Sequence, residues 1–115
     1  MLFEDAKLHL SDILESIKFV EEFVRDMDLD TYRHDWKTQA AVERKMLVIS
    51  EAAIRLKDDA ELLCPGVPWR DIRGIGNWLR HQYDRVVVET VWNTIQDDLP
   101  LLKAEVEMAL ARQDK

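Results

Sequence analysis

The chain has 115 residues, with 16 Lys and Arg against 23 Asp and Glu, so its formal net charge is −7. This length is typical of one domain, which we expect to span residues 1–115, and the scarcity of glycine and proline favours an all-α fold. The acidic balance argues against a broad nucleic-acid surface and against DNA as a partner, and no apolar run approaches the roughly 20 residues that cross a bilayer.

The first predicted helix covers residues 3–27, because its apolar residues recur at steps of three and four. The N-terminus lacks the basic and apolar regions of a signal peptide, which favours a cytoplasmic protein. Residues 26–35 are polar and turn-like, and Asp28, Asp30 or Thr31 is placed to cap the next helix. The apolar stripe of the first helix consists of Leu10, Ile13, Leu14, Ile17, Val20, Val24 and Met27.

The second predicted helix covers residues 38–63 and ends before the turn at Pro65-Gly66. Small side chains in its middle, around Ser50 and Ala53, would let another helix approach closely. The lone Cys64 excludes an intrachain disulfide and is expected to be a small buried residue in a reducing compartment. The apolar stripe consists of Val42, Met46, Ile49, Ala53 and Leu56.

The third predicted helix is short, beginning near Pro68 and ending at about residue 81 or 83. Gly74 and Gly76 each cost roughly 1 kcal/mol relative to alanine inside a helix, so this helix needs support from packing. The same glycines permit close approach of a partner helix or an RNA backbone. The buried stripe of the helix is predicted to be Trp69, Ile72, Ile75 and Leu79.

The last helical region covers residues 88–112 and is predicted to kink or restart at Pro100, because proline removes a backbone donor and crowds the preceding turn. Together the four segments predict a small up-and-down bundle of four main helices, the third short and the last interrupted. Trp78 and Trp92 are expected to belong to the core rather than to stack on nucleic-acid bases.

The segment 65–85 differs from the rest of the chain, because it is net positive within a net negative protein. Such local contrast suits a focused anion site. The segment contains two acidic residues, Asp71 and Asp84, and four arginines, which are Arg70, Arg73, Arg80 and Arg85.

Three residues of this segment, Arg73, Asn77 and His81, are spaced at i, i+4 and i+8 and are therefore expected on one helix face. An imidazole can act as acid and base, a guanidinium can stabilise a phosphate transition state, and an amide can orient either group. These groups suit metal-independent RNA cleavage by the ribose 2′-OH. Arg73 lies about 12 Å along the axis from His81 and points away from it, so two chains related by a two-fold axis would complete the site.

Other chemistries find less support in the sequence. No Glu-x-x-His pairs and no His/Cys spacing suggest a metal, so no metal and no cofactor are expected. Ser11 and Ser50 lack a histidine at fixed spacing for a hydrolytic triad. The remaining alternative is that the polar segment is only a rim that closes the bundle.

The run from Val67 to Tyr83 resembles the signature region of HepT-like proteins of the HEPN superfamily. Residues 43–56 resemble the second helix of that family, and residues 91–102 resemble its last. The most specific part is the Asn-x-Leu-x-His-x-Tyr pattern at 77–83, which follows Pro-Trp-Arg-Asp-Ile.

The resemblance implies a toxin of a two-gene toxin–antitoxin pair, active as a dimeric, metal-independent ribonuclease with an Arg-x(4–6)-His motif at the dimer cleft. It also implies an antitoxin that is a minimal nucleotidyltransferase. In the family this antitoxin can transfer AMP to the tyrosine two residues after the histidine, which is Tyr83 in this sequence.

One position departs from the family pattern, because the usual motif arginine would fall at Gly76. If the chain is a ribonuclease toxin, His81 is the general acid/base, Arg73 or Arg80 supplies the guanidinium and Asn77 orients them. The remaining assignments are phosphate contacts at Arg70 and Arg85 and the modified residue at Tyr83. The alternative is a catalytically weak or inactive HEPN-type module that docks a nucleotidyltransferase.

Overall fold

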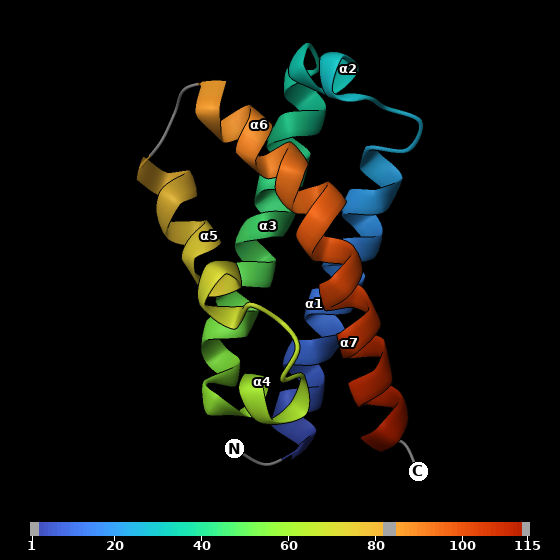
Figure 1. Cartoon of the computed structure of the whole chain (residues 1–115), viewed down its shortest axis with the longest axis vertical. Coiled ribbons are helices and arrows are strands. Elements are labelled where there is room, and N and C mark those ends of the chain that lie inside the picture. The colour runs from blue at the N-terminus through green and yellow to red at the C-terminus, as the bar shows by residue number, and fades with distance from the viewer. Residues whose placement is uncertain (1–2, 82–84, 114–115) are drawn as a thin grey trace.

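The computed structural model describes residues 3–81 and 85–113, and within these ranges it contains helices and no strand (Figure 1). Four legs alternate in direction along the long axis: α1, then α3, then α5, then the combined α6, η1 and α7 (Figure 1). The predicted all-α up-and-down bundle is therefore confirmed. The elements are α1 (Phe3–Phe23), α2 (Leu29–Arg33), α3 (Trp36–Leu56), α4 (Asp58–Leu63), α5 (Trp69–His81), α6 (Arg85–Asn93), the π-helix η1 (Thr94–Asp98) and α7 (Leu99–Gln113).

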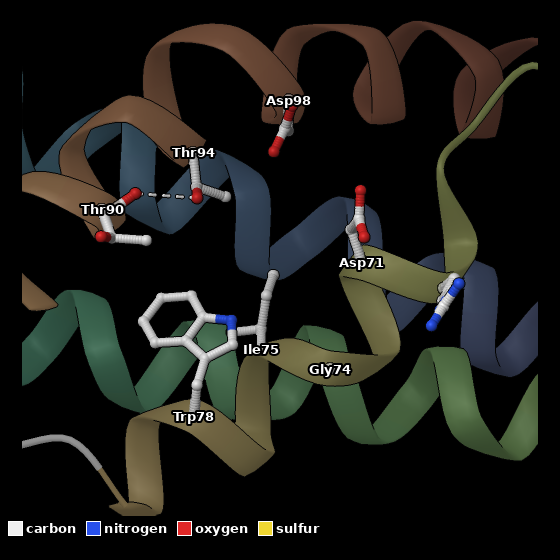
Figure 2. Close-up of a pocket in the computed structure, with 8 residues that line it drawn as sticks. Asp71, Gly74, Ile75, Trp78, Thr90, Thr94 and Asp98 are labelled. Atoms are coloured by element: carbon white, nitrogen blue, oxygen red, sulfur yellow. Dashed lines mark hydrogen bonds between the residues drawn. The ribbon is translucent and has the colours of Figure 1, made fainter.

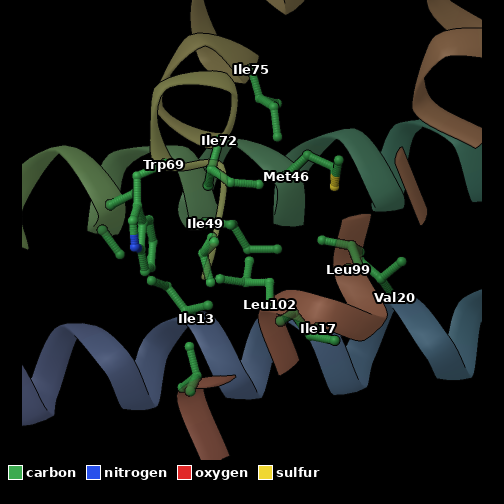
Figure 3. Close-up of a cluster of buried hydrophobic side chains, with 14 of the residues drawn as sticks. Ile13, Ile17, Val20, Met46, Ile49, Trp69, Ile72, Ile75, Leu99 and Leu102 are labelled. Atoms are coloured by element: carbon green, nitrogen blue, oxygen red, sulfur yellow. The ribbon is translucent and has the colours of Figure 1, made fainter. Parts of the chain in front are cut away.

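The hydrophobic core lies where the four legs meet (Figure 3). Each predicted stripe contributes to it, and the stripe of α5 is buried along its whole length. Burial of this kind stabilises each large apolar side chain by roughly 1.5–3 kcal/mol, which offsets the cost of two glycines in a short helix. Among the side chains that meet here are Ile13, Ile17, Met46, Ile49, Trp69, Ile72, Leu99 and Leu102.

The segment between α1 and α3 contains a short helix, α2, where the sequence predicts only a turn. Asp28, one of the three predicted capping residues, is the N-cap of α2. The Asp28 carboxylate accepts a 2.8 Å hydrogen bond from the Thr31 amide. Tyr32 of this helix is fully buried, with its ring centroid 5.2 Å from that of Trp92. Burial of this aromatic ring explains why a helix of five residues persists, since so short a helix is marginal alone.

The second predicted helix is divided in the structure, so the prediction of a continuous helix over 38–63 is wrong. Helix α3 ends at Leu56, Lys57 adopts a positive φ of 52°, and α4 begins at Asp58. Cys64 follows α4 and is buried as predicted, and burial raises the pKa of its thiol to about 11. A buried thiol with a raised pKa is a poor nucleophile, which fits a packing role.

The last leg contains the predicted interruption at Pro100, in the form of one wide turn. In η1 the Leu99 amide donates to the Thr94 carbonyl five residues earlier, and α7 starts at Leu99. Pro100 therefore occupies the first turn of α7, where its missing amide donor costs little. Among the described residues, none of the helices is both long and apolar enough to cross a membrane.

Candidate active site

Helix α5 carries the predicted site, and one of its sides lies over a pocket. Residues three, four, seven or eight apart share a side of a helix, as Arg70, Gly74 and Trp78 do. These three line a pocket between α5 and the last leg (Figure 2). His81 is three residues beyond Trp78 and seven beyond Gly74, so it continues this side, which we call the pocket face.

Another side of α5 rests on α3 through Ser50. The Ser50 hydroxyl donates to the Arg73 carbonyl at 2.8 Å and accepts a 3.1 Å hydrogen bond from the Gly76 amide. A methyl group at Gly76 would lie 3.0 Å from that hydroxyl oxygen. The predicted close approach at the small residues of α3 is thus confirmed, with α5 as the approaching helix and Gly76 at the contact.

Arg73 is bound to the end of α3 and to α4. Its guanidinium donates to both carboxylate oxygens of Glu61, at 2.7 and 2.6 Å, and to the Lys57 carbonyl at 2.8 Å. Its Nε donates to the Ala53 carbonyl at 3.3 Å. The hydrogen bond from Arg73 lowers the pKa of Glu61, and the Glu61 carboxylate raises the pKa of Arg73. The Nε contact satisfies the Ala53 carbonyl near the end of α3, where the Lys57 amide donates to the Ile54 carbonyl instead.

These contacts fix where the Arg73 side chain lies relative to Asn77 and His81. The Arg73 guanidinium reaches sideways to α3 and α4 and is held there by its hydrogen bonds. Asn77 and His81 are both exposed, so the structure leaves them together without Arg73.

Arg80 is placed differently from Arg73. It is exposed, and within residues 3–81 and 85–113 its guanidinium has no ion-pair or hydrogen-bond partner. Its Nη2 atom lies 3.5 Å from where a Cβ would stand on Gly76. A guanidinium therefore lies over Gly76, the position at which the side chain of the motif arginine is missing.

For two of the predicted site residues, the structure describes no side chain. Arg85 is the first residue of α6, and its side chain is outside the described set. Tyr83, the predicted modification site, lies outside the described residues. Arg70, the other predicted phosphate contact, is exposed at the rim of the pocket.

The pocket on this side of α5 has a volume of about 330 Å³. The indole of Trp78 forms one wall, packing partly against the core as predicted and partly lining the pocket (Figure 2). The last leg forms the opposite wall, where the Thr94 hydroxyl donates to the Thr90 carbonyl at 2.9 Å. The lining residues are Arg70, Asp71, Gly74, Ile75, Trp78, Thr90, Thr94 and Asp98.

Two carboxylates, Asp71 from α5 and Asp98 from η1, face the space between these walls (Figure 2). Neither has a hydrogen-bond or ion-pair partner in the part of the chain that the structure describes. Burial, followed by the charges of Asp97 and Asp71, raises the pKa of Asp98. Sequence reasoning missed Asp98 and the threonines as pocket residues, since the only signal there is an acidic pair before Pro100.

The fold and the site define a small all-α domain with an exposed arginine–histidine pair at the end of its third leg. The chain belongs to the ribonuclease HepT-like family, whose model matches residues 13–109. It is 38% identical over 101 residues to "Probable ribonuclease HepT" of Thermococcus cleftensis, covering 88% of this chain and 92% of that protein. It is 35% identical over 104 residues to a "Putative RNase" of Methanocaldococcus jannaschii, covering 90% and 95% of the two chains. No solved structure matches the chain.

Proposed function

We propose that this protein is a metal-independent endoribonuclease of the HepT kind, with His81 as its general acid/base. The observation that carries the proposal is the exposed Arg80–His81 pair at the end of α5 in a chain of the ribonuclease HepT-like family. The imidazole takes the proton of a ribose 2′-OH, whose oxygen attacks the adjacent phosphorus. The P–O5′ bond breaks, the leaving oxygen gains a proton, and a 2′,3′-cyclic phosphate remains.

Arg80 is the better candidate for the guanidinium that stabilises the pentacoordinate phosphate. Arg73 already holds Glu61 and backbone carbonyls, and recruiting it would break those hydrogen bonds. Arg80 has no such contact among the described residues and lies over Gly76. Its charge is therefore available to a substrate, while Asn77, exposed one turn before His81, orients the reacting groups.

A dimer would complete the reaction site. Attack and departure of the two oxygens occur on opposite sides of phosphorus, so one histidine at the end of one helix cannot serve both at once. A two-fold axis near the end of α5 would place two copies of His81 and of Arg80 around one phosphate. Arg70 and Arg85 would then contact neighbouring phosphates of the RNA.

The same segment suits control by a partner. We infer a cytoplasmic toxin–antitoxin pair in which a minimal nucleotidyltransferase attaches AMP to Tyr83. The adenylyl group would add bulk and negative charge two residues from His81, next to the arginines that RNA phosphates need. RNA would then be excluded from the site, and the antitoxin would have a charged group to bind.

Expression of the toxin alone tests the proposal. Wild-type protein is expected to arrest growth and to cleave RNA in the presence of EDTA, and His81→Ala is expected to reduce cleavage by about 10²–10⁴-fold. Glu51→Gln is a suitable control, because Glu51 is exposed on α3 and pairs only with Arg55 among the described residues. Cleavage that survives His81→Ala unchanged would overturn the assignment.

A second function, a binding module without cleavage, is favoured by one observation, the missing side chain at Gly76. It predicts a stable complex with the nucleotidyltransferase and no RNA cleavage at any protein concentration. RNA cleavage separates the two functions, and intact mass after co-expression with the neighbouring reading frame tests the modification, because the chain would gain one AMP that Tyr83→Phe removes. A neighbouring frame that encodes no nucleotidyltransferase would overturn both partner proposals.

A further inference from the structure

We propose that the pocket beside His81 binds a guanine base of the RNA and so gives the enzyme its sequence preference. This inference rests on the proposed ribonuclease function and deepens it. The pocket is lined from α5 by Arg70, Asp71 and Trp78 and from the last leg by Asp98 (Figure 2). None of these residues takes part in the acid/base chemistry described above, apart from the phosphate contact suggested for Arg70.

The pocket lies next to the reaction site on the same side of the same helix. Trp78 precedes His81 by three residues, which is about 4.5 Å along the axis, so the two side chains are neighbours on the pocket face. Helical side chains lean toward the N-terminus, which directs His81 toward the pocket rather than away from it. A nucleotide whose phosphate lies at His81 would therefore have its base within reach of Trp78.

The size and walls of the pocket suit one flat base. Its volume of about 330 Å³ is at the lower end of the range for small-molecule sites, roughly 300–1,000 Å³. The Trp78 indole is only partly buried, so one part of it packs on the core and another is open to the pocket. Stacking of a base on an aromatic side chain contributes to binding for every base, so Trp78 explains affinity and not preference.

The two carboxylates supply the preference. An ionised carboxylate only accepts hydrogen bonds, so Asp71 and Asp98 select a base edge that presents donors. The Watson–Crick edge of guanine offers two adjacent donors, N1–H and N2–H, which one carboxylate can accept together. Adenine and cytosine each present a single amino group on that edge and uracil a single N3–H. Guanine is thus the base that best satisfies these two residues.

Arg70 completes the match from the pocket rim. A guanidinium donates readily to the O6 and N7 acceptors of guanine, on the edge next to its N1–H. The acid pair also argues against a phosphate in this pocket, because two carboxylates would repel it. The charges of the described residues therefore place the base in the pocket and the phosphate beside Arg80 and His81.

Binding of uncleavable dinucleotides tests the inference separately from catalysis. The probes are 2′-deoxy GpA and 2′-deoxy ApA, titrated calorimetrically into the full-length protein, wild type and His81→Ala. We expect the guanine probe to bind at least about tenfold more tightly than the adenine probe, and Asp98→Asn and Asp71→Asn to reduce that ratio toward one. Glu51→Gln is the control, since it removes one carboxylate from α3 that does not line the pocket.

The outcomes separate this inference from the proposed function. Equal affinity for the two probes, with cleavage still dependent on His81, overturns the guanine site and leaves the ribonuclease intact. A guanine preference without any His81-dependent cleavage overturns the ribonuclease and leaves a guanine-binding pocket. Pocket variants that weaken only the complex with the nucleotidyltransferase would show that the carboxylates bind a basic side chain of that protein, which also overturns the guanine site.

Discussion

The Ser50 hydroxyl and the Gly76 amide form a 3.1 Å hydrogen bond that joins helix α3 to helix α5. This contact is close enough that a methyl group at Gly76 would lie 3.0 Å from the Ser50 oxygen. It therefore sets which side chain position 76 can carry. An arginine there would have to displace Ser50 or leave the helix interface, and the guanidinium of Arg80 already lies over the position.

Gly76→Ala is expected to lower the free energy of unfolding by about 1 kcal/mol, because overpacking against Ser50 outweighs the gain in helix propensity. In a Ser50→Ala background the nearest oxygen is gone, and the same substitution should stabilise the protein by up to about 1 kcal/mol. Urea unfolding of the four proteins of the double-mutant cycle measures the change in unfolding free energy in each background and so tests both expected signs. An identical effect of Gly76→Ala in the two backgrounds would show that the contact is not limiting.

Arg73→Ala and Arg80→Ala are expected to have opposite effects on stability and activity. Loss of Arg73 removes its ion pair with Glu61 and its hydrogen bonds to the Ala53 and Lys57 carbonyls, so the thermal midpoint should fall while cleavage per folded molecule is retained. Loss of Arg80 should reduce kcat by about 10²–10³-fold with a change in unfolding free energy within about 0.5 kcal/mol. Arg80→Lys, which keeps the charge but not the planar fork, is expected to recover part of the activity.

If Arg73→Ala abolished cleavage in protein shown by circular dichroism to be folded, the roles of the two arginines would have to be exchanged. Glu61→Gln provides the matching control, because it removes the charge partner of Arg73 without changing any residue of α5. It should lower the thermal midpoint and leave kcat unchanged.

Asp98→Asn is expected to stabilise the protein in a pH-dependent manner. Burial and the charges of Asp97 and Asp71 raise the pKa of Asp98 above its usual 3.8, with Arg70 the cation that lines the same pocket. A raised pKa means that the folded state binds the proton more tightly, so the contribution of Asp98 to stability is lost as pH rises through the folded pKa. The difference in unfolding free energy between variant and wild type should grow over that range and be smallest below pH 3.8.

The measurement is urea unfolding of both proteins at a series of pH values. Subtracting the wild type matters, because Asp28, Asp35 and Glu61 have lowered pKa values and make the whole protein less stable in acid. A difference that is constant with pH would exclude an effect of Asp98 ionisation.

Tyr32→Phe is expected to leave the protein equally stable or more stable. The Tyr32 hydroxyl is buried and has no hydrogen-bond partner among the described residues, and burial raises its pKa. Removing an unsatisfied buried hydroxyl removes a desolvation cost of about 1–3 kcal/mol, while the ring contact with Trp92 remains. Thermal unfolding checks this, and a clear loss of stability would indicate that the hydroxyl has a partner.

The bundle could be predicted from the sequence because the apolar residues of each helix recur at helical spacing and lie on its buried side. The break at Lys57 could not, since apolar spacing continues from Leu56 to Ala60 and both are buried. The break coincides with a tertiary contact: Arg73, sixteen residues further on, donates to the Lys57 carbonyl where α3 ends. No local pattern contains that contact.

The candidate site could be predicted only in part, because some of its contacts join residues that are distant in the sequence. His81, Asn77 and Arg80 belong to one helix, so spacing alone placed them near one another. Arg73 is held by Glu61, which is twelve residues away in the sequence. The pocket is lined in part by Asp98, which belongs to another leg. Helical spacing carries no information on which residues of two distant segments face each other.

The wide turn η1 has a consequence for the pocket. It inserts about one extra residue, which rotates the later part of the leg by about 100° relative to an uninterrupted α-helix. Val91, Ile95 and Leu99 are all buried despite successive steps of four residues, because the wide turn absorbs the drift. Without this wide turn, an uninterrupted α-helix of the same residues would turn Asp98 relative to the part of the leg before it. The groups that line the pocket thus depend on the local type of helix in the last leg as well as on the identity of its residues.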